Sequence, residues 1–241
     1  MTYTVESSLT SVTHDGMIRG HVANGHVIGD DYLLGFVQGT LDSAEALLVA
    51  TQYRIAPETV TRVKILAECA AASFENAKPQ TMRCSAQAFF EERCTSSREE
   101  RKNTPKKHCA VPEPLQAFVG ETYCDISWTT LFPRVEEKVL SIKGSQLHAC
   151  LFKMAKGASV PVHTHQGDAA VLVLCGSFAD RGAVYQKGDV IFFTANPDVT
   201  HNPEAIEDCI CFGVFHAPLK FKSLWQHLFY RVRRGIARCR G

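Results

Sequence analysis

Hydrophobic residues recur at helical spacing in an early part of this chain and gather into short runs in a later part. Between residues 30 and 75, apolar side chains return every three or four positions, as they do along one face of a helix. From residue 125 to about 220 they form runs bounded by Gly, Pro and Asp, the pattern of buried strands joined by turns. The pattern therefore predicts an α+β protein in which a small helical domain precedes a β domain.

Helix start and stop signals divide the first part into several helices. An aspartate pair can cap a short helix that ends at Gly39. Asp42, with Glu45 three residues later, has the form of a capping box that begins a second helix. Pro57 suits the first turn of a third helix, and a last helix is predicted over residues 81–93.

Composition shifts along the chain predict five segments. Residues 1–29 are polar and read as an irregular tail, residues 30–93 form the helical domain, and the charged stretch 94–124 reads as a solvated linker. Residues 125–220 form the β domain. Residues 221–241 combine apolar residues at helical spacing with five arginines, which predicts a basic amphipathic C-terminal helix.

The C-terminal helix could lie on an anionic membrane surface or bind an acidic partner. Docking of its apolar stripe on the molecule's own β domain is slightly favoured. The chain as a whole is nearly neutral, with 26 Lys and Arg against 25 Asp and Glu, so no direct nucleic-acid partner is expected.

A cytoplasmic location is predicted, because no apolar run approaches a membrane span and the first residues lack a signal-peptide hydrophobic region. The ten cysteines are scattered without a Cys-x-x-Cys motif, which in a reducing compartment favours buried or inert thiols. Cys209 and Cys211 form the only close pair, and paired core residues are favoured over redox or metal chemistry there.

Two histidines separated by a single residue are the first candidate metal ligands. In an extended segment His163 and His165 project to the same side. His201 follows a second apolar strand and a proline-containing loop, so it could return to the pair from a partner strand. Converging imidazoles suit a first-row divalent metal, and the alternative is a barrel that retains these histidines without a stable metal.

The same stretch resembles the cupin family. It runs from Gly157 through five residues to His-x-His, then a strand and a Gly, and later a Gly-Asp turn followed by a lone His. The resemblance implies a small, jelly-roll-like antiparallel β-barrel with His163, His165 and His201 at the positions of the family's histidine ligands. It also implies one divalent metal, with zinc preferred and iron as the alternative.

One position departs from the cupin pattern. The family carries a glutamate four residues after the second histidine of its first motif, and Ala169 stands there in this chain. Asp168 is the nearest carboxylate but comes one residue early, on the opposite face of a strand. Asp168 is therefore kept as a questionable fourth ligand, beside an open position for water.

The helical part resembles the N-terminal domain of ChrR-type anti-sigma factors. The matching features are Leu33-Leu34 with Gly39-Thr40-Leu41, the stretch from Ala44 to Thr51, and Ala56-Pro57-Glu58-Thr59 before an apolar helix. That family joins this domain to a C-terminal cupin, and this chain has the same order. The resemblance implies that the helices mask an extracytoplasmic-function type sigma factor until an oxidative change at the cupin releases it.

The family's N-terminal zinc motif is missing. Its pattern, His-x-x-x-Cys-Pro-x-Cys, falls on Gln52, Ala56 and Thr59, with Pro57 kept. An amide, a methyl and a hydroxyl cannot replace an imidazole and two thiolates, so no zinc is expected in the N-terminal domain. Apolar packing or a partner must hold the helices instead. Retained sigma binding is slightly favoured over a vestigial helical appendage.

Two further classes of function stay open. One is a metal-dependent cupin enzyme of the dioxygenase or isomerase type, and the other is a cupin that binds a small ligand without turnover. The missing glutamate at Ala169 and the lack of a convincing acid and base set count against the enzyme. The sequence is compatible with a homodimer but does not decide it.

Overall fold

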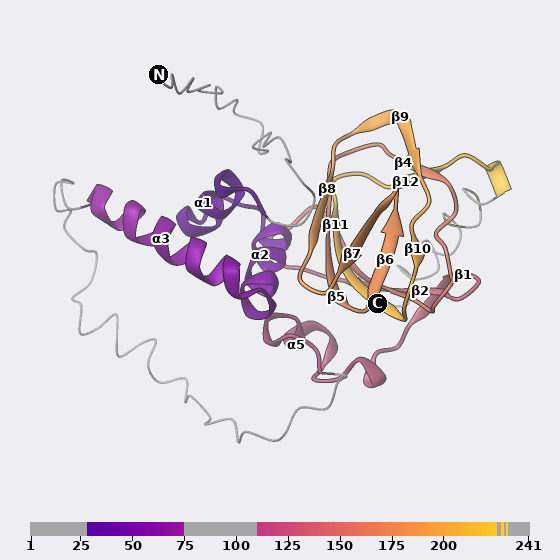
Figure 1. The fold of residues 1–241 in the computed structure, drawn as a ribbon, viewed down its shortest axis with the longest axis horizontal. Coiled ribbons are helices and arrows are strands. Elements are labelled where there is room, and N and C mark those ends of the chain that lie inside the picture. Colours follow the sequence, from indigo (N-terminus) through magenta and orange to yellow (C-terminus); the bar gives the residue numbers. More distant parts are fainter. Residues whose placement is uncertain (1–27, 75–109, 226–227, 229, 231–241) are drawn as a thin grey trace, which may run out of the picture.

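The computed structural model describes residues 28–74, 110–225, 228 and 230, and in it a group of helices lies against one side of a β-barrel (Figure 1). The helices are α1 (Asp30–Gln38), α2 (Ser43–Ile55), α3 (Pro57–Phe74) and the shorter α5 (Glu113–Val119). The helix predicted over residues 81–93 lies outside the described residues.

The first helices begin and end where the local signals predict. Gly39 ends α1 with φ at 70°, a left-handed conformation that glycine adopts at little cost. The Asp42 side chain accepts a hydrogen bond from the Ala44 N–H at 2.8 Å, and Glu45 accepts one from the Asp42 N–H at 3.2 Å. This capping box satisfies backbone donors at the start of α2 that would otherwise lack partners.

The β domain contains one large and two small antiparallel sheets. The large sheet has the strand order β1-β2-β3-β11-β5-β8, and the small sheets have the orders β10-β6-β7 and β12-β4-β9. The strands are β1 (Thr129–Phe132), β2 (Val135–Leu140), β3 (His148–Met154), β4 (His163–His165), β5 (Ala169–Cys175), β6 (Ser177–Asp180), β7 (Ala183–Gln186), β8 (Val190–Phe193), β9 (Asn196–His201), β10 (Glu204–Ala205), β11 (Cys209–Phe215) and β12 (Leu219–Phe221). This arrangement confirms the predicted α+β class with a cupin-like barrel.

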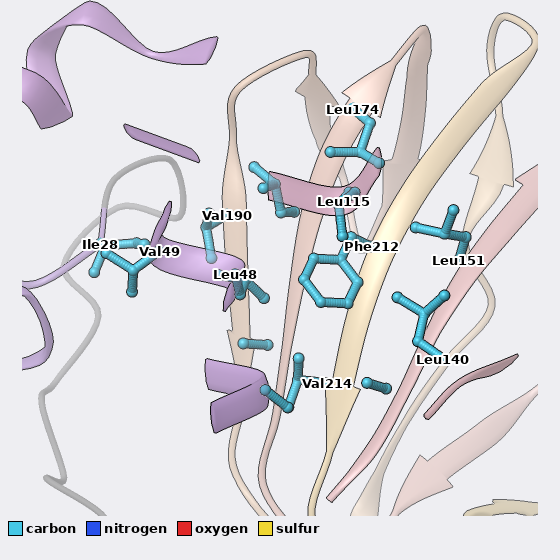
Figure 2. Packing of buried hydrophobic residues seen from close by; sticks show 14 of the residues in the cluster. Ile28, Leu48, Val49, Leu115, Leu140, Leu151, Leu174, Val190, Phe212 and Val214 are labelled. Carbon is cyan, nitrogen blue, oxygen red and sulfur yellow. The ribbon is translucent and has the colours of Figure 1, made fainter. Parts of the chain in front are cut away.

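The large sheet is buried on both faces. Phe212 of β11 belongs to an outer cluster that also contains Leu48 and Val49 of α2, whereas Cys211 belongs to an inner cluster inside the barrel. Figure 2 shows Leu48 and Val49 beside the strands that carry Val190, Phe212 and Val214. Burial on both faces explains why β5 and β11 are continuous apolar runs rather than alternating ones. Helix α2 therefore completes the core of the barrel's outer face.

The prediction of a solvated linker over residues 94–124 is wrong for its last part. Residues 110–124 contain α5, whose Leu115 is fully buried in the outer cluster, and Ala110 pairs with Thr122 in an isolated bridge. The charged residues that suggested a linker precede residue 110 and lie outside the described part. The tail predicted over residues 1–29 also ends early, because Ile28 is fully buried in the same cluster.

The predicted C-terminal helix cannot begin at Phe221. This residue ends β12, which pairs with β4, and the backbone is helical at Leu224 and Trp225. Residues 226–227, 229 and 231–241 lie outside the described part. None of the described helices is by itself long and apolar enough to cross a membrane, although α1 and α2, bent by 110° where they meet, have that length and composition together.

Candidate metal site

Three histidines converge inside the barrel. His163 and His165 are the ends of β4, and His201 is the last residue of β9, the strand that pairs with β4. In this pairing His163 lies opposite His201. The ligand nitrogens of the three side chains lie within 4.8 Å of one another, and all three residues are buried. The structure thus brings together the histidines that the sequence singled out.

Hydrogen bonds orient two of the rings. Nδ1 of His163 lies 2.8 Å from the backbone carbonyl oxygen of Pro161, and Nδ1 of His201 lies 2.8 Å from Oδ2 of Asp180. Each acceptor takes a proton from Nδ1, so Nε2 of the same ring carries a lone pair. Nε2 of His201 lies 2.9 Å from Nε2 of His165. Lone pairs directed at a shared point are what a metal ion requires.

Burial keeps these rings uncharged. Burial, and then the neighbouring His201, lower the pKa of His163 to about 4. Burial, followed by His163 and His201, lowers the pKa of His165 to about 3. Both rings are therefore neutral near pH 7, the form that binds a metal. Nδ1 of His165 is buried and finds no hydrogen-bond partner in the described part of the chain.

Asp180 contacts the histidine cluster and was not predicted from the sequence. It ends β6, in a different small sheet from the histidines, and is 5% exposed. Its carboxylate is the one negative group that contacts the rings directly among the described residues, since it accepts the hydrogen bond from His201. A lone carboxylate at the end of an apolar strand was the available signal, but no spacing rule connects it to His201.

Asp168 is not a fourth ligand in this structure. Its Oδ1 accepts a hydrogen bond from the backbone N–H of Ala195 at 2.7 Å, and it does not belong to the histidine cluster. It directly precedes Ala169, which begins β5 and is buried, so the two residues face opposite sides. The questionable assignment of Asp168 to the site is therefore corrected.

Two small cavities meet at the histidines. An apolar cavity of about 60 Å³ lies inside the barrel, and His165 and His201 also line a polar cavity of about 120 Å³. The first is lined additionally by Phe152, Val171 and Cys211, and the second by Arg181, Thr194 and Asn196. The donor set of three imidazoles with adjoining space fits a divalent metal with an open coordination position.

Comparisons with known proteins cover both parts of the chain. Residues 117–220 match the ChrR cupin-like domain family. Over 216 residues the chain is 30% identical to the anti-sigma-E factor ChrR of Cereibacter sphaeroides, an alignment that covers 86% of this chain and 98% of that protein. The chain belongs to the ChrR family. It also resembles a chain in the crystal structure of Rhodobacter sphaeroides SigE in complex with the anti-sigma ChrR, with 28% identity and a TM-score of 0.65, covering 79% of this chain and 98% of that one.

The positions that carry the ChrR-type zinc motif hold a hydrogen-bond relay in this chain. Thr59 Oγ1 donates to Oε1 of Gln52 at 3.1 Å, and Nε2 of Gln52 donates to the backbone carbonyl oxygen of Gly188 at 2.9 Å. Both side chains are buried. The relay joins α2 to α3 and joins both to the turn before β8. Here the ChrR-type helices are thus fastened to the barrel by polar contacts as well as by the shared core.

A second polar junction lies at the other end of α2. Glu45, buried at 2% exposure, accepts a hydrogen bond from His216 Nε2 at 3.1 Å. Ser145 Oγ donates to Oδ1 of Asp42 at 2.6 Å. The hydrogen bond with Glu45 raises the pKa of His216, and burial together with Glu45 raises the pKa of Tyr32. The capping box of α2 therefore also serves as an attachment point for the barrel.

The close cysteine pair lies in the inner core. The sulfurs of Cys209 and Cys211 are 3.5 Å apart, and both residues are buried. Their mutual hydrogen bond and their burial raise the pKa of Cys211. A thiol held in its protonated form is a weak nucleophile, which fits the interpretation of this pair as core residues.

Proposed function

We propose that this chain is an anti-sigma factor that binds an extracytoplasmic-function type sigma factor through its helices. The similarity to an anti-sigma factor, which spans 98% of that relative and includes both the helices and the barrel, carries this proposal. Such a protein acts in the cytoplasm, where sigma factors meet RNA polymerase. The partner is a protein, and the nearly balanced charge of the chain supports no direct contact with nucleic acid.

The second half of α3 offers a surface for the sigma factor. Ile65 is 54% exposed, and Cys69 and Ala72, which follow it by four and seven residues on the same face of the helix, are exposed too. A single exposed apolar side chain is ordinary on a protein surface, and it is the similarity to an anti-sigma factor that makes this helix face the candidate contact. Helix α3 packs on α1 and α2, which in turn lie on the barrel, so these contacts fix the orientation of α3.

We extend the proposal to a divalent metal held by His163, His165 and His201, with zinc preferred and iron as the alternative. A bound ion would draw the three imidazoles together and act as a centre that an oxidative signal could disturb. Asp180 would fix the Nε2 of His201 toward the ion through its hydrogen bond. Ala169 supplies no fourth protein ligand, which leaves room for water.

A short physical path connects this site with the helices. Cys211 lines the cavity at the histidines, and the next residue, Phe212, belongs to the outer cluster that contains Leu48 of α2. Because close-packed interiors transmit displacement, a shift of β11 on the cavity side would move the surface on which α2 rests. This path supports a sensor role for the barrel.

The size and lining of the inner cavity disfavour the enzyme alternative. About 60 Å³ admits a few waters or a diatomic gas but not an organic substrate of ordinary size. In the described part of the chain the carboxylate that contacts the rings is that of Asp180, and it already accepts a hydrogen bond from His201. The adjoining polar cavity adds about 120 Å³, and its described lining contains Arg181, Thr194 and Asn196 but no carboxylate, so it offers neither the room nor the acid and base set that a dioxygenase or isomerase needs.

Co-purification tests the proposal. The full chain is co-expressed with each extracytoplasmic-function sigma factor of its own genome, and bound complexes are then assayed for inhibition of sigma-dependent transcription. We expect one complex, and we expect Ile65→Asp to weaken it at least about tenfold because a charge would be buried in the contact. Val184→Asp, at an equally exposed position (54%) on β7, is the matched control and should bind normally. Failure of every sigma factor to bind would refute the proposal.

A further inference from the structure

A second group of metal-ligating side chains lies apart from the three histidines. Glu137 comes from β2, and His148 and Cys150 come from the neighbouring strand β3. In the register of these strands Val139 faces Cys150, so alternation places Glu137, His148 and Cys150 on one face of the sheet. Cys150 belongs to the inner cluster, which identifies this face as the interior of the barrel.

The three side chains are close enough to share an ion. Nε2 of His148 lies 3.1 Å from Oε1 of Glu137. One ligand atom from each residue lies within 4.8 Å of the others. Glu137 is 2% exposed and Cys150 is fully buried, while the His148 side chain is 17% exposed. A buried carboxylate needs a compensating positive charge, and either a protonated histidine or a metal ion can supply it.

We propose that Glu137, His148 and Cys150 form a second site for a divalent metal, with zinc the best match. A carboxylate and a thiolate provide two negative charges, and a neutral imidazole provides none, so a dication bound by them makes a neutral unit. The Cys150 thiol releases its proton to solvent when the sulfur binds the ion. Sulfur, nitrogen and oxygen donors together are a ligand set that zinc accepts, with a fourth position left for water.

The two clusters differ in the charge that a dication would leave behind. Imidazole ligands carry no negative charge, so a dication at the histidine site would keep its charge of two, and among the described residues Asp180 is the carboxylate that contacts these rings. The second cluster cancels the charge with its own ligands. An uncompensated ion is costly to bury. The electrostatic cost of burying a dication is therefore lower at the cluster of Glu137, His148 and Cys150 than at the histidine site.

The surroundings give an ion access and keep the two clusters separate. Val139, directly opposite Cys150, is 39% exposed, and with the partly exposed His148 it marks an open rim of the barrel. Phe215 lies between the clusters, with its ring centroid 6.1 Å from that of His148 and 6.1 Å from that of His165. An added Cβ at Gly213, the residue opposite Cys150 on β11, would meet this Phe215 ring at 2.5 Å. The absence of a side chain at Gly213 leaves room for the Phe215 ring, which separates the two clusters.

Cobalt spectroscopy distinguishes a metal site from a plain Glu137–His148 ion pair beside a core cysteine. The metal-free full chain is titrated with Co²⁺, and thiolate-to-cobalt charge-transfer absorption is recorded in the near ultraviolet. Only a site with a cysteine ligand gives this band. We expect it in the wild-type chain and in His165→Ala, which disables the histidine site, and we expect Cys150→Ala to abolish it.

Matched variants make each result decisive. Cys211→Ala removes another buried thiol, one that lines the histidine cavity, and should keep the band. Glu137→Gln preserves the shape of the side chain and should weaken Co²⁺ binding at the band by at least about tenfold, even if Cys150→Ala fails to fold. Absence of the band in wild type, its survival in Cys150→Ala, its loss in Cys211→Ala, or unchanged affinity in Glu137→Gln would each overturn the proposal.

Discussion

Asp180 decides which nitrogen of His201 faces the barrel interior. Its carboxylate accepts the Nδ1 proton at 2.8 Å, which leaves the Nε2 lone pair directed toward His165. Three of the four residues in this arrangement could be found from the sequence, because His-x-His and a later lone histidine follow a spacing rule. Asp180 could not, since its partnership depends on how two small sheets close around the cavity. Residue spacing along the sequence therefore reveals side chains that meet on adjacent strands. It does not reveal side chains that meet only because separate sheets close around a cavity.

We expect Asp180→Asn to weaken metal binding by roughly 10- to 100-fold. An amide oxygen can still accept the Nδ1 proton, but it lacks the charge that makes the ring a strong ligand. Competition with a chromophoric chelator measures the affinity. Asp198→Asn, an exposed change on β9, is the control and should bind metal as the wild type does. Equal affinity for the two variants would contradict the role of Asp180.

Gln52→Ala should lower the free energy of unfolding by about 1–3 kcal/mol. The substitution leaves the carbonyl oxygen of Gly188 and the hydroxyl of Thr59 buried without their present partner. Denaturant unfolding measures the loss. Gln186→Ala removes an exposed glutamine from β7 and should change stability by no more than about 0.5 kcal/mol. A similar effect of both changes would show that the relay contributes nothing.

Helix α2 belongs to the helical part of the chain and is also attached to the barrel. Its start, its end and its apolar face contact the barrel through Glu45, Gln52 and Leu48 respectively. Its boundaries were predictable because the capping signals are local. Its place on the sheet was not predictable, since the residues that attach it lie more than 100 positions away along the chain. The same limit hid α5, a seven-residue helix whose Leu115 is recognisable as core only once the sheet is in place.

Leu48→Ala should cost about 2–5 kcal/mol of unfolding free energy, because a fully buried leucine would be replaced by a cavity between α2 and the sheet. Thermal or denaturant unfolding checks this value. Leu224→Ala is a suitable control because Leu224 is 85% exposed. A loss at Leu48 no larger than at Leu224 would mean that α2 is not part of the common core.

The attachment of α2 should weaken as the pH rises. The folded protein holds the pKa of His216 above its ordinary value of 6.5. The stabilisation is therefore complete below that value and is lost as the pH rises through the higher, folded-state pKa. We expect the unfolding free energy of His216→Gln to fall less steeply over this range than that of the wild type. Parallel pH profiles for the two proteins would contradict the assignment.

The helices and the barrel should unfold as one unit. The outer cluster contains residues of α1, α2, α5 and the large sheet, so neither part has a complete core without the other. Far-ultraviolet circular dichroism follows the helices, and near-ultraviolet dichroism follows aromatic packing in the barrel. We expect coincident transitions by both probes. Separate midpoints would show that the helical part is an independent domain.

The relay of Gln52 and Thr59 has a consequence for how such a regulator responds to its surroundings. A helical unit pinned by its own zinc would fall apart when that ion is scarce, whatever the state of the barrel. In this chain the barrel is the anchor of the helices, so no ion of their own is needed to hold them in place. Loss of a metal from the barrel and chemical damage to the barrel would therefore reach the helices by the same route.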